Sequence, residues 1–296
     1  MASIGRISSS SQGLQNMDSV AGMQKRMAQL QQQVSSGKAI QRASENPGGT
    51  QSVLTLRAET ARAGQYTKNI DNGLLRLNAA RTQVDSINEQ LMKVRELVIQ
   101  GQSSATPANV RSALANQVDV LRSSLLVAAN GDFAGRPLFA GSTSGASAYD
   151  ASGNYVGDTT AVTTRVDDSG STVRIEVNGP EIFGSGASNA FALLTTIASS
   201  LRNTPADLAA NLSSLDSVIS TARGAQATVL SRINQLNELH SVTADRELGL
   251  AGALGAVENT DLGKAVMELT VQQTGYQAAL YATAKVMQPS LMEFLR

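Results

Sequence analysis

The sequence predicts a mainly α-helical protein: a long antiparallel helical bundle or coiled coil formed by both chain ends, with a small β-rich outer domain inserted in the middle. Hydrophobic residues recur every three and four positions near both termini, which is the pattern of paired helices. The stretch 131–187 is instead rich in Gly, Ser, Thr and Asp and contains short alternating runs. Aromatic residues make up only 3% of the 296 residues and Trp is absent, which favours thin helical bundles over a thick core.

The first predicted helix covers about 14–34. Its polar side is rich in Gln and poor in charge, which suits a surface that packs against protein. Gly37 follows the helix at a C-cap-like position. The apolar positions that we expect to associate are Val20, Met23, Met27, Leu30 and Val34.

Two further helices precede the middle of the chain. Asn46 and Pro47 supply an N-cap and a first-turn proline, and they begin a helix predicted over 47–100. An apolar residue recurs at every seventh position along this helix, which would be about 80 Å long at 1.5 Å per residue. Gly101 is expected to end it, and a return helix is predicted over 106–128.

The middle of the chain is predicted to be a small, exposed, largely β domain. Alternating runs at 162–166 and 173–177 are typical of short strands. Asn178 and Gly179 form a turn signal directly after the second run.

Helical spacing then returns over 191–201. Thr204 and Pro205 begin another long helix, whose heptad pattern continues to Thr243. A last helix is expected after an N-capping stretch at 259–261. Three glycines are expected to loosen the chain before that cap: Gly249, Gly252 and Gly255.

The last helix, Leu262–Arg296, carries a second set of heptad positions that we predict to contact other subunits. Its polar members, Gln273 and Thr283, are candidates for setting the register. The terminal helices have too few apolar positions to offset the entropy of ordering them alone, so we hypothesise that they order fully only on assembly. The predicted positions are Leu262, Val266, Leu269, Gln273, Tyr276, Leu280, Thr283, Met287, Leu291 and Phe294.

These elements predict three parts. The terminal association helices are 1–45 and 258–296, the helical rod is 46–130 and 188–257, and the β-rich outer domain is 131–187. In the simplest arrangement the chain runs out, builds the outer domain and returns, so that the terminal helices lie side by side.

The composition offers little for chemistry. Charged residues are 16% of the chain and balanced, 24 basic against 24 acidic, so we expect no nucleic-acid partner. No run approaches the roughly 18 apolar residues of a membrane span, so no membrane insertion is expected. There is no Cys, and the lone His240 falls on a predicted helix, where a packed or half-exposed polar role is the ordinary one. We predict that Asp167-Asp168 lies in a solvated turn and not in a cation-binding loop. We therefore predict no enzyme, no catalytic or metal-binding residues and no cofactor.

Several motifs resemble known proteins. Ser35-Ser36-Gly37-Lys38 and Ala43-Ser44-Glu45-Asn46-Pro47 resemble the N-terminal signature of bacterial flagellins and their junction homologues. The end, 288–296, is similar to the C-terminus of the same superfamily. Within it, the opening 5–8 and the Phe-Ala-Gly motif in 135–141 resemble the hook–filament junction family.

This resemblance implies a structural protein of the bacterial flagellum that is extracellular and exported unfolded by the flagellar type III apparatus, without a cleaved signal peptide. It would form a ring of copies of itself between hook-associated protein 1, below, and flagellin, above. An export chaperone would bind it in the cytoplasm, through the C-terminal helix. The sequence departs from the family at Glu45-Asn46, where two Asp usually precede the Pro, which puts an acidic contact in doubt but keeps the capped helix start.

Two alternatives remain open. The first is a flagellin filament subunit, which would share the terminal helices; the motif Phe139-Ala140-Gly141 argues against it. The second is an enzyme or ligand-binding module in the outer domain, for which that domain offers no convergent polar residues.

Overall fold

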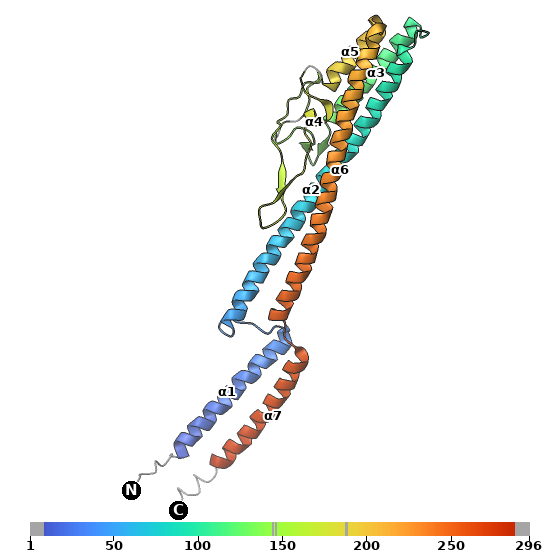
Figure 1. The fold of residues 1–296 in the computed structure, drawn as a ribbon. Coiled ribbons are helices and arrows are strands. Elements are labelled where there is room, and N and C mark those ends of the chain that lie inside the picture. The colour runs from blue at the N-terminus through green and yellow to red at the C-terminus, as the bar shows by residue number, and fades with distance from the viewer. Residues whose placement is uncertain (1–8, 144, 146, 187–188, 288–296) are drawn as a thin grey trace, which may run out of the picture. The chain divides into compact units, whose positions relative to one another are not determined.

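The computed structural model describes residues 9–143, 145, 147–186 and 189–287 (Figure 1). It confirms a mainly helical chain with a few small antiparallel strands in the middle. The helices are α1 (Ser9–Ser36), α2 (Pro47–Gln102), α3 (Ala108–Ala129), α4 (Gly179–Phe183), α5 (Ala190–Asn203), the 3-10 turn η2 (Pro205–Asp207), α6 (Leu208–Glu258) and α7 (Leu262–Met287). The strands are β1 (Asp132–Phe133), β2 (Arg136–Pro137), β3 (Thr163–Arg165) and β4 (Thr172–Arg174).

The chain divides into two compact units. The first unit comprises Met1–Ala61 and Leu248–Arg296, and the second comprises Arg62–Glu247. The helices α2 and α6 therefore contribute to both units. The three-part division drawn from the sequence stays a prediction.

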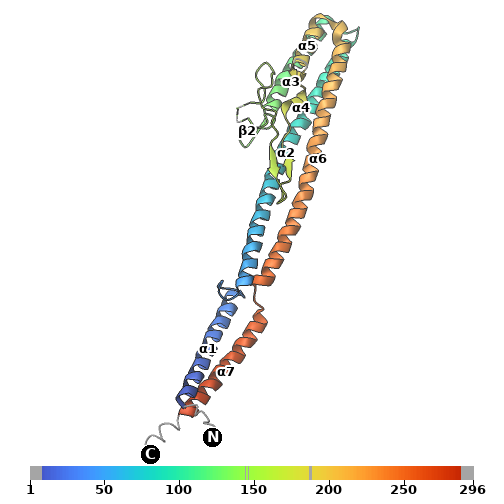
Figure 2. The ribbon, with the colours of Figure 1, turned by 60° about the vertical axis from the view of Figure 1, so that its left-hand side comes forward.

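In the first unit α1 and α7 lie side by side, as both views show (Figures 1 and 2). Gly37 ends α1 by adopting a positive φ of 69°, which a residue without Cβ reaches at no steric cost. The predicted caps are present: the Asn46 Oδ1 accepts from the Gly49 N–H at 2.9 Å, and the Asp261 Oδ1 accepts from the Lys264 N–H at 3.0 Å. Local sequence therefore determines where these helices begin and end.

The segment that follows α1 is joined to the segment that precedes α7. Lys38 and Asn259 form an antiparallel bridge. The Ala39 N–H donates to the Glu258 carbonyl at 2.7 Å, and the Thr260 N–H donates to the Gly37 carbonyl at 2.9 Å. We call this arrangement the connecting bridge.

In the second unit the long helices share one hydrophobic core with the middle segment. The seven-residue periodicity predicted for both long helices is confirmed, because these positions point into the core. Buried heptad positions are Ile70, Leu77, Val84, Leu91 and Val98 in α2, and Leu208, Leu215, Ala222, Val229 and Leu236 in α6.

The middle segment contains less strand than predicted. β3 pairs with β4 over three residues only. At the next residue pair the Ile175 N–H still donates to the Val162 carbonyl at 3.0 Å, but the Val162 N–H donates to the side chain of Glu176 at 2.8 Å instead of returning the bond. The turn predicted at Asn178-Gly179 is wrong: Gly179 begins helix α4. The strand predicted at 162–166 is thus correct in place but too long, whereas the one predicted at 173–177 is shifted, because β4 begins at Thr172 and ends at Arg174.

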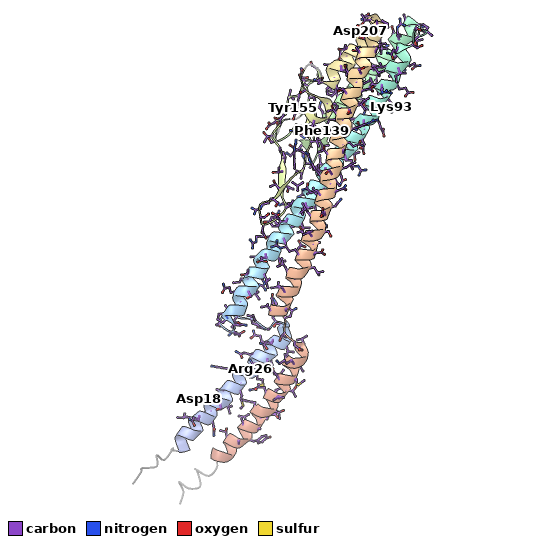
Figure 3. All side chains as sticks on the ribbon, viewed as in Figure 1. Asp18, Arg26, Lys93, Phe139, Tyr155 and Asp207 are labelled. Carbon is purple, nitrogen blue, oxygen red and sulfur yellow. The ribbon has the colours of Figure 1, made fainter. Side chains whose placement is uncertain are left out.

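The middle segment is also more firmly packed than an exposed domain would be. Four aromatic rings meet in the core, with centroids 4.9 Å apart between Phe183 and Phe191 and 5.0 Å apart between Tyr149 and Phe191. The backbone of Phe139 joins this cluster, since its carbonyl accepts from the Gly179 N–H at 2.9 Å and from the Tyr155 hydroxyl at 3.1 Å. Figure 3 places Phe139 and Tyr155 in this region.

The glycines do not interrupt the helices as predicted. α6 continues through Gly249, Gly252 and Gly255 to Glu258, because a cost of about 1 kcal/mol per glycine is small in a helix of 51 residues held by packing. Gly101 also lies inside its helix, where a Cβ would come within 2.3 Å of the Leu201 Cδ2. That glycine permits close approach of α5.

Replacing Gly252 with Ala should stabilise the end of α6. A Cβ at this position would meet no atom within 4 Å, so the variant gains helix propensity without a clash. We expect a gain of about 1 kcal/mol, seen as roughly fivefold slower amide hydrogen exchange around residue 252. Gly101→Ala is the control and should destabilise its helix. Faster exchange in Gly252→Ala would contradict this account.

Candidate functional site: the terminal helix pair

The α1 residues predicted to associate with other subunits lie in the helix that packs against α7 of the same chain. Val20, Met23, Met27 and Val34 are half-buried and Leu30 is only 2% exposed, in the helix that lies against α7. Polar contacts join the same two helices: the Gln272 side chain donates to the Met23 carbonyl at 3.4 Å, and Arg26 pairs with Glu268 at 3.4 Å.

The predicted positions of α7 fall into two groups. Leu269, Tyr276 and Thr283 are half-buried. Gln273 is exposed, as are Leu262, Val266 and Leu280, the last at 44%. Leu291, Phe294 and the side chain of Met287 lie outside the described residues.

Sequence reasoning missed the small and polar residues of α7 that are covered alongside the first group. Ala265 is buried, and Gln272 and Ala279 are half-buried. Together with Leu269, Tyr276 and Thr283 they follow the same alternation of three and four residues, shifted from the one predicted. The signal was present in the spacing, but the shifted set contains fewer large apolar residues.

α7 carries apolar side chains beyond the side that lies against α1. A helix with one buried side normally carries mainly polar residues on the rest of its surface. We call the exposed apolar residues the outer face of α7: Leu262, Val266, Met267, Val271, Leu280 and Tyr281. Exposed apolar side chains grouped on one helix are a feature of interaction sites.

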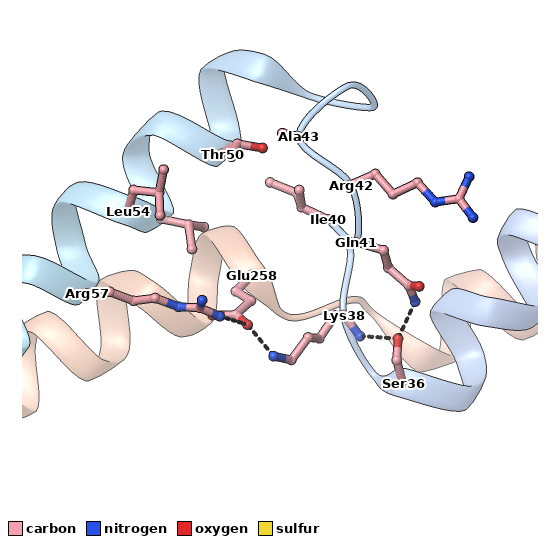
Figure 4. A pocket seen from close by; sticks show the side chains of 11 residues that line it. Ser36, Lys38, Ile40, Gln41, Arg42, Ala43, Thr50, Leu54, Arg57 and Glu258 are labelled. Atoms are coloured by element: carbon pink, nitrogen blue, oxygen red, sulfur yellow. Dashed lines mark hydrogen bonds and ion pairs between the residues drawn. The ribbon is translucent and has the colours of Figure 1, made fainter.

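A polar centre lies next to the connecting bridge, within the first unit. The carboxylate of Glu258, which is 8% exposed, accepts from the Lys38 Nζ at 2.6 Å and from Arg57 at 2.7 Å, both through Oε1 (Figure 4). These contacts, that of Lys38 first, lower the pKa of Glu258. An open cavity of about 320 Å³ adjoins them, with Ile40 and Leu54 among its apolar lining residues.

The Phe-Ala-Gly motif is a structural anchor. Leu138, Phe139 and Ala140 are buried, and Arg76 of α2 donates to the Pro137 carbonyl at 3.0 Å. Gly141 has a φ of 70°, and a Cβ there would lie 1.9 Å from the Asp158 carbonyl oxygen. The motif therefore fastens the middle segment to α2.

Other candidate residues have structural roles. His240 is half-exposed, with its Nε2 3.3 Å from the Asp71 Oδ1. The turn at Asp167-Asp168 is more than solvated, because Asp168 accepts from the Tyr66 hydroxyl at 3.1 Å and from Arg246 at 2.8 Å, tying the β3–β4 hairpin to α2 and α6. Hydrogen bonds from Ser171 and Ser169 lower the pKa of Asp167 to about 2.

In the part of the chain that the structure describes, no group of three or more His, Asp or Glu side chains is placed to hold a metal ion. Within the same part no helix is both long and apolar enough to cross a membrane.

Comparison with known proteins gives a consistent result. Residues 7–144 match the bacterial flagellin N-terminal helical region. The flagellar hook-associated protein 3 of Escherichia coli is 26% identical over 94% of this chain and 96% of its own length, and that of Salmonella typhimurium is 26% identical over 96% and 97%. The flagellar junction protein FlgL of Legionella pneumophila has the same fold, with a TM-score of 0.59 over 70% of this chain and all of that one, at 13% identity.

The predicted resemblance is thereby confirmed. The matched region contains α1, α2 and α3 together with the Phe-Ala-Gly motif, and the relatives extend the similarity through α7. The chain is therefore similar over nearly its whole length to flagellar hook-associated protein 3, and its N-terminal part matches the flagellin N-terminal helical region.

Proposed function

We propose that this chain is the hook–filament junction subunit, which links hook-associated protein 1 at the hook end to the flagellin filament through α1 and α7. The observation that supports this most directly is the outer face of α7, a set of exposed apolar side chains on a helix that α1 covers on one side. The names of its relatives, hook-associated protein 3 and a flagellar junction protein, agree with the proposal.

In this role the chain associates with copies of itself in a ring at the outside end of the hook. The subunit-interface residues are the exposed ones of the predicted set, namely Leu262, Val266, Gln273 and Leu280. The half-buried residues of the set align α1 with α7 and so present the outer face to neighbouring subunits. The chain reaches this location by flagellar type III export without a cleaved signal peptide, and an export chaperone covers its C-terminal helix beforehand.

A flagellin filament subunit is the second candidate, because the matched region is that of the flagellins. The two roles differ in polymerisation: a filament subunit forms long homopolymers, whereas a junction subunit adds only to a prepared end. We therefore propose to incubate the purified full chain under filament-forming conditions, alone and with isolated hooks, and to locate it on flagella by immunogold labelling.

The junction role predicts no homopolymer, addition to hooks that already carry hook-associated protein 1, and gold particles only where hook and filament meet. Long filaments from the pure chain, with gold along the whole flagellum, would establish the filament subunit instead. Absence of the chain from isolated flagella would refute both roles.

A further inference from the structure

In the cavity beside Glu258 the positive charges outnumber the negative ones. Two cations, Lys38 and Arg57, share a single carboxylate oxygen, and about half of each cationic side chain stays exposed. An arginine has five N–H donors and a lysine has three, so donors remain to bind a second carboxylate. Arg42 also lines the cavity, so three cations face the single carboxylate of Glu258, and the cavity is suited to a negatively charged ligand.

Apolar residues line the same cavity. Ile40 and Leu54 are among its lining residues, and Leu54 is 61% exposed. Figure 4 shows them beside the Glu258 ion pairs. A fitting partner would present aliphatic side chains next to its carboxylate.

The beginning of α1 presents such a combination. Asp18 is the single acidic residue of α1; it is exposed and makes no ion pair with any residue in the described ranges (Figure 3). Leu14 and Met17, one turn and one residue before it, are also exposed. We call Leu14, Met17 and Asp18 the α1 patch.

The α1 patch cannot reach the cavity of its own chain. Asp18 lies 18 residues before Ser36 in one continuous helix, which corresponds to about 27 Å. The C-terminal part of α1 thus separates the two complementary surfaces. A contact between them joins two copies head to tail and leaves one patch and one cavity free for the next copies, which is the requirement for a ring or a helical array.

We propose that the α1 patch of one copy docks in the cavity of a second copy, with Asp18 pairing to Lys38 and Arg57 and with Leu14 and Met17 on Ile40 and Leu54. This interface rests on the proposed function, because it needs a subunit that associates with itself. It differs from the outer face of α7 in being a charge-directed contact, which fixes the order of the subunits.

Cross-linking of assembled flagella tests the contact directly. The chain has no cysteine, so Leu54→Cys and Ser19→Cys, at the exposed position next to Asp18, each provide a unique thiol and keep the Asp18 carboxylate. Cells that lack the native chain express both variants together, and the isolated flagella are treated with a short bis-maleimide. We expect a covalent dimer from this pair, and none above background when Leu75→Cys, an exposed apolar position of the second unit, replaces Leu54→Cys.

Charge substitution provides the second measurement. Asp18→Asn should lower the amount of chain in flagella roughly tenfold, and Asp18→Glu should restore it to within about twofold of wild type. Equal incorporation of Asp18→Asn, or incorporation of both cysteine variants without cross-linking, would overturn the head-to-tail contact. Absence of the wild-type chain from flagella would instead remove the proposed function itself.

Discussion

Leu280→Asp is expected to abolish incorporation of the chain into flagella while leaving the second unit folded. Leu280 belongs to the outer face of α7 and is 44% exposed, so an aspartate there stays hydrated in the free protein. In the assembled state the same carboxylate would have to leave water without a partner, which costs several kcal/mol. Incorporation is measured by immunoblotting isolated flagella, and motility by swimming in soft agar.

Leu75→Asp is the matched control. Leu75 is an apolar residue of the second unit, 57% exposed, and the proposed assembly surface does not include it. This variant should incorporate normally, and both variants should show the wild-type urea midpoint for the second unit. Normal motility with Leu280→Asp would refute an assembly role for the outer face.

Phe139→Ala should produce the largest loss of stability, about 4 kcal/mol in the free energy of unfolding of the second unit. Its side chain is 0% exposed, so removing the ring leaves a cavity in the core shared by the middle segment and the helices. Urea titration followed by circular dichroism measures this loss.

Phe133→Ala serves as the comparison, because Phe133 in β1 is only partly buried against the same core. We expect it to lose less than half as much. Equal losses in the two variants would mean that the middle segment packs loosely and that the motif at Phe139 has no anchoring role.

The helical part of the fold could be predicted because its determinants are local. A heptad position such as Leu77 and a cap such as Asn46 can be recognised from residues one or two helical turns away. In the structure Leu77 is buried and Asn46 makes its capping hydrogen bond, so tertiary packing is consistent with the local pattern. The glycines of α6 were misjudged because packing along a 51-residue helix outweighs the propensity of one residue.

The middle segment depends on contacts between residues far apart in the sequence. Glu176 ends the β3–β4 ladder by accepting from Val162, and Arg76 reaches Pro137 from another element. Neither partner could be identified from spacing. The surface of α7 was partly predictable. Leu269, Tyr276 and Thr283 belong both to the predicted set of heptad positions and to the shifted set that is covered. Which set is covered depends on the contact with α1, which spacing alone does not reveal.

The connecting bridge has a mechanical consequence for the first unit. Because the backbone hydrogen bonds Ala39–Glu258 and Thr260–Gly37 join the two connections, neither α1 nor α7 can be displaced along its axis without shearing the bridge or carrying the other helix with it. Tension on one terminal helix is thereby shared between two segments of the same backbone. In the proposed junction role, load applied to either end of the chain would therefore be carried by both terminal helices at once.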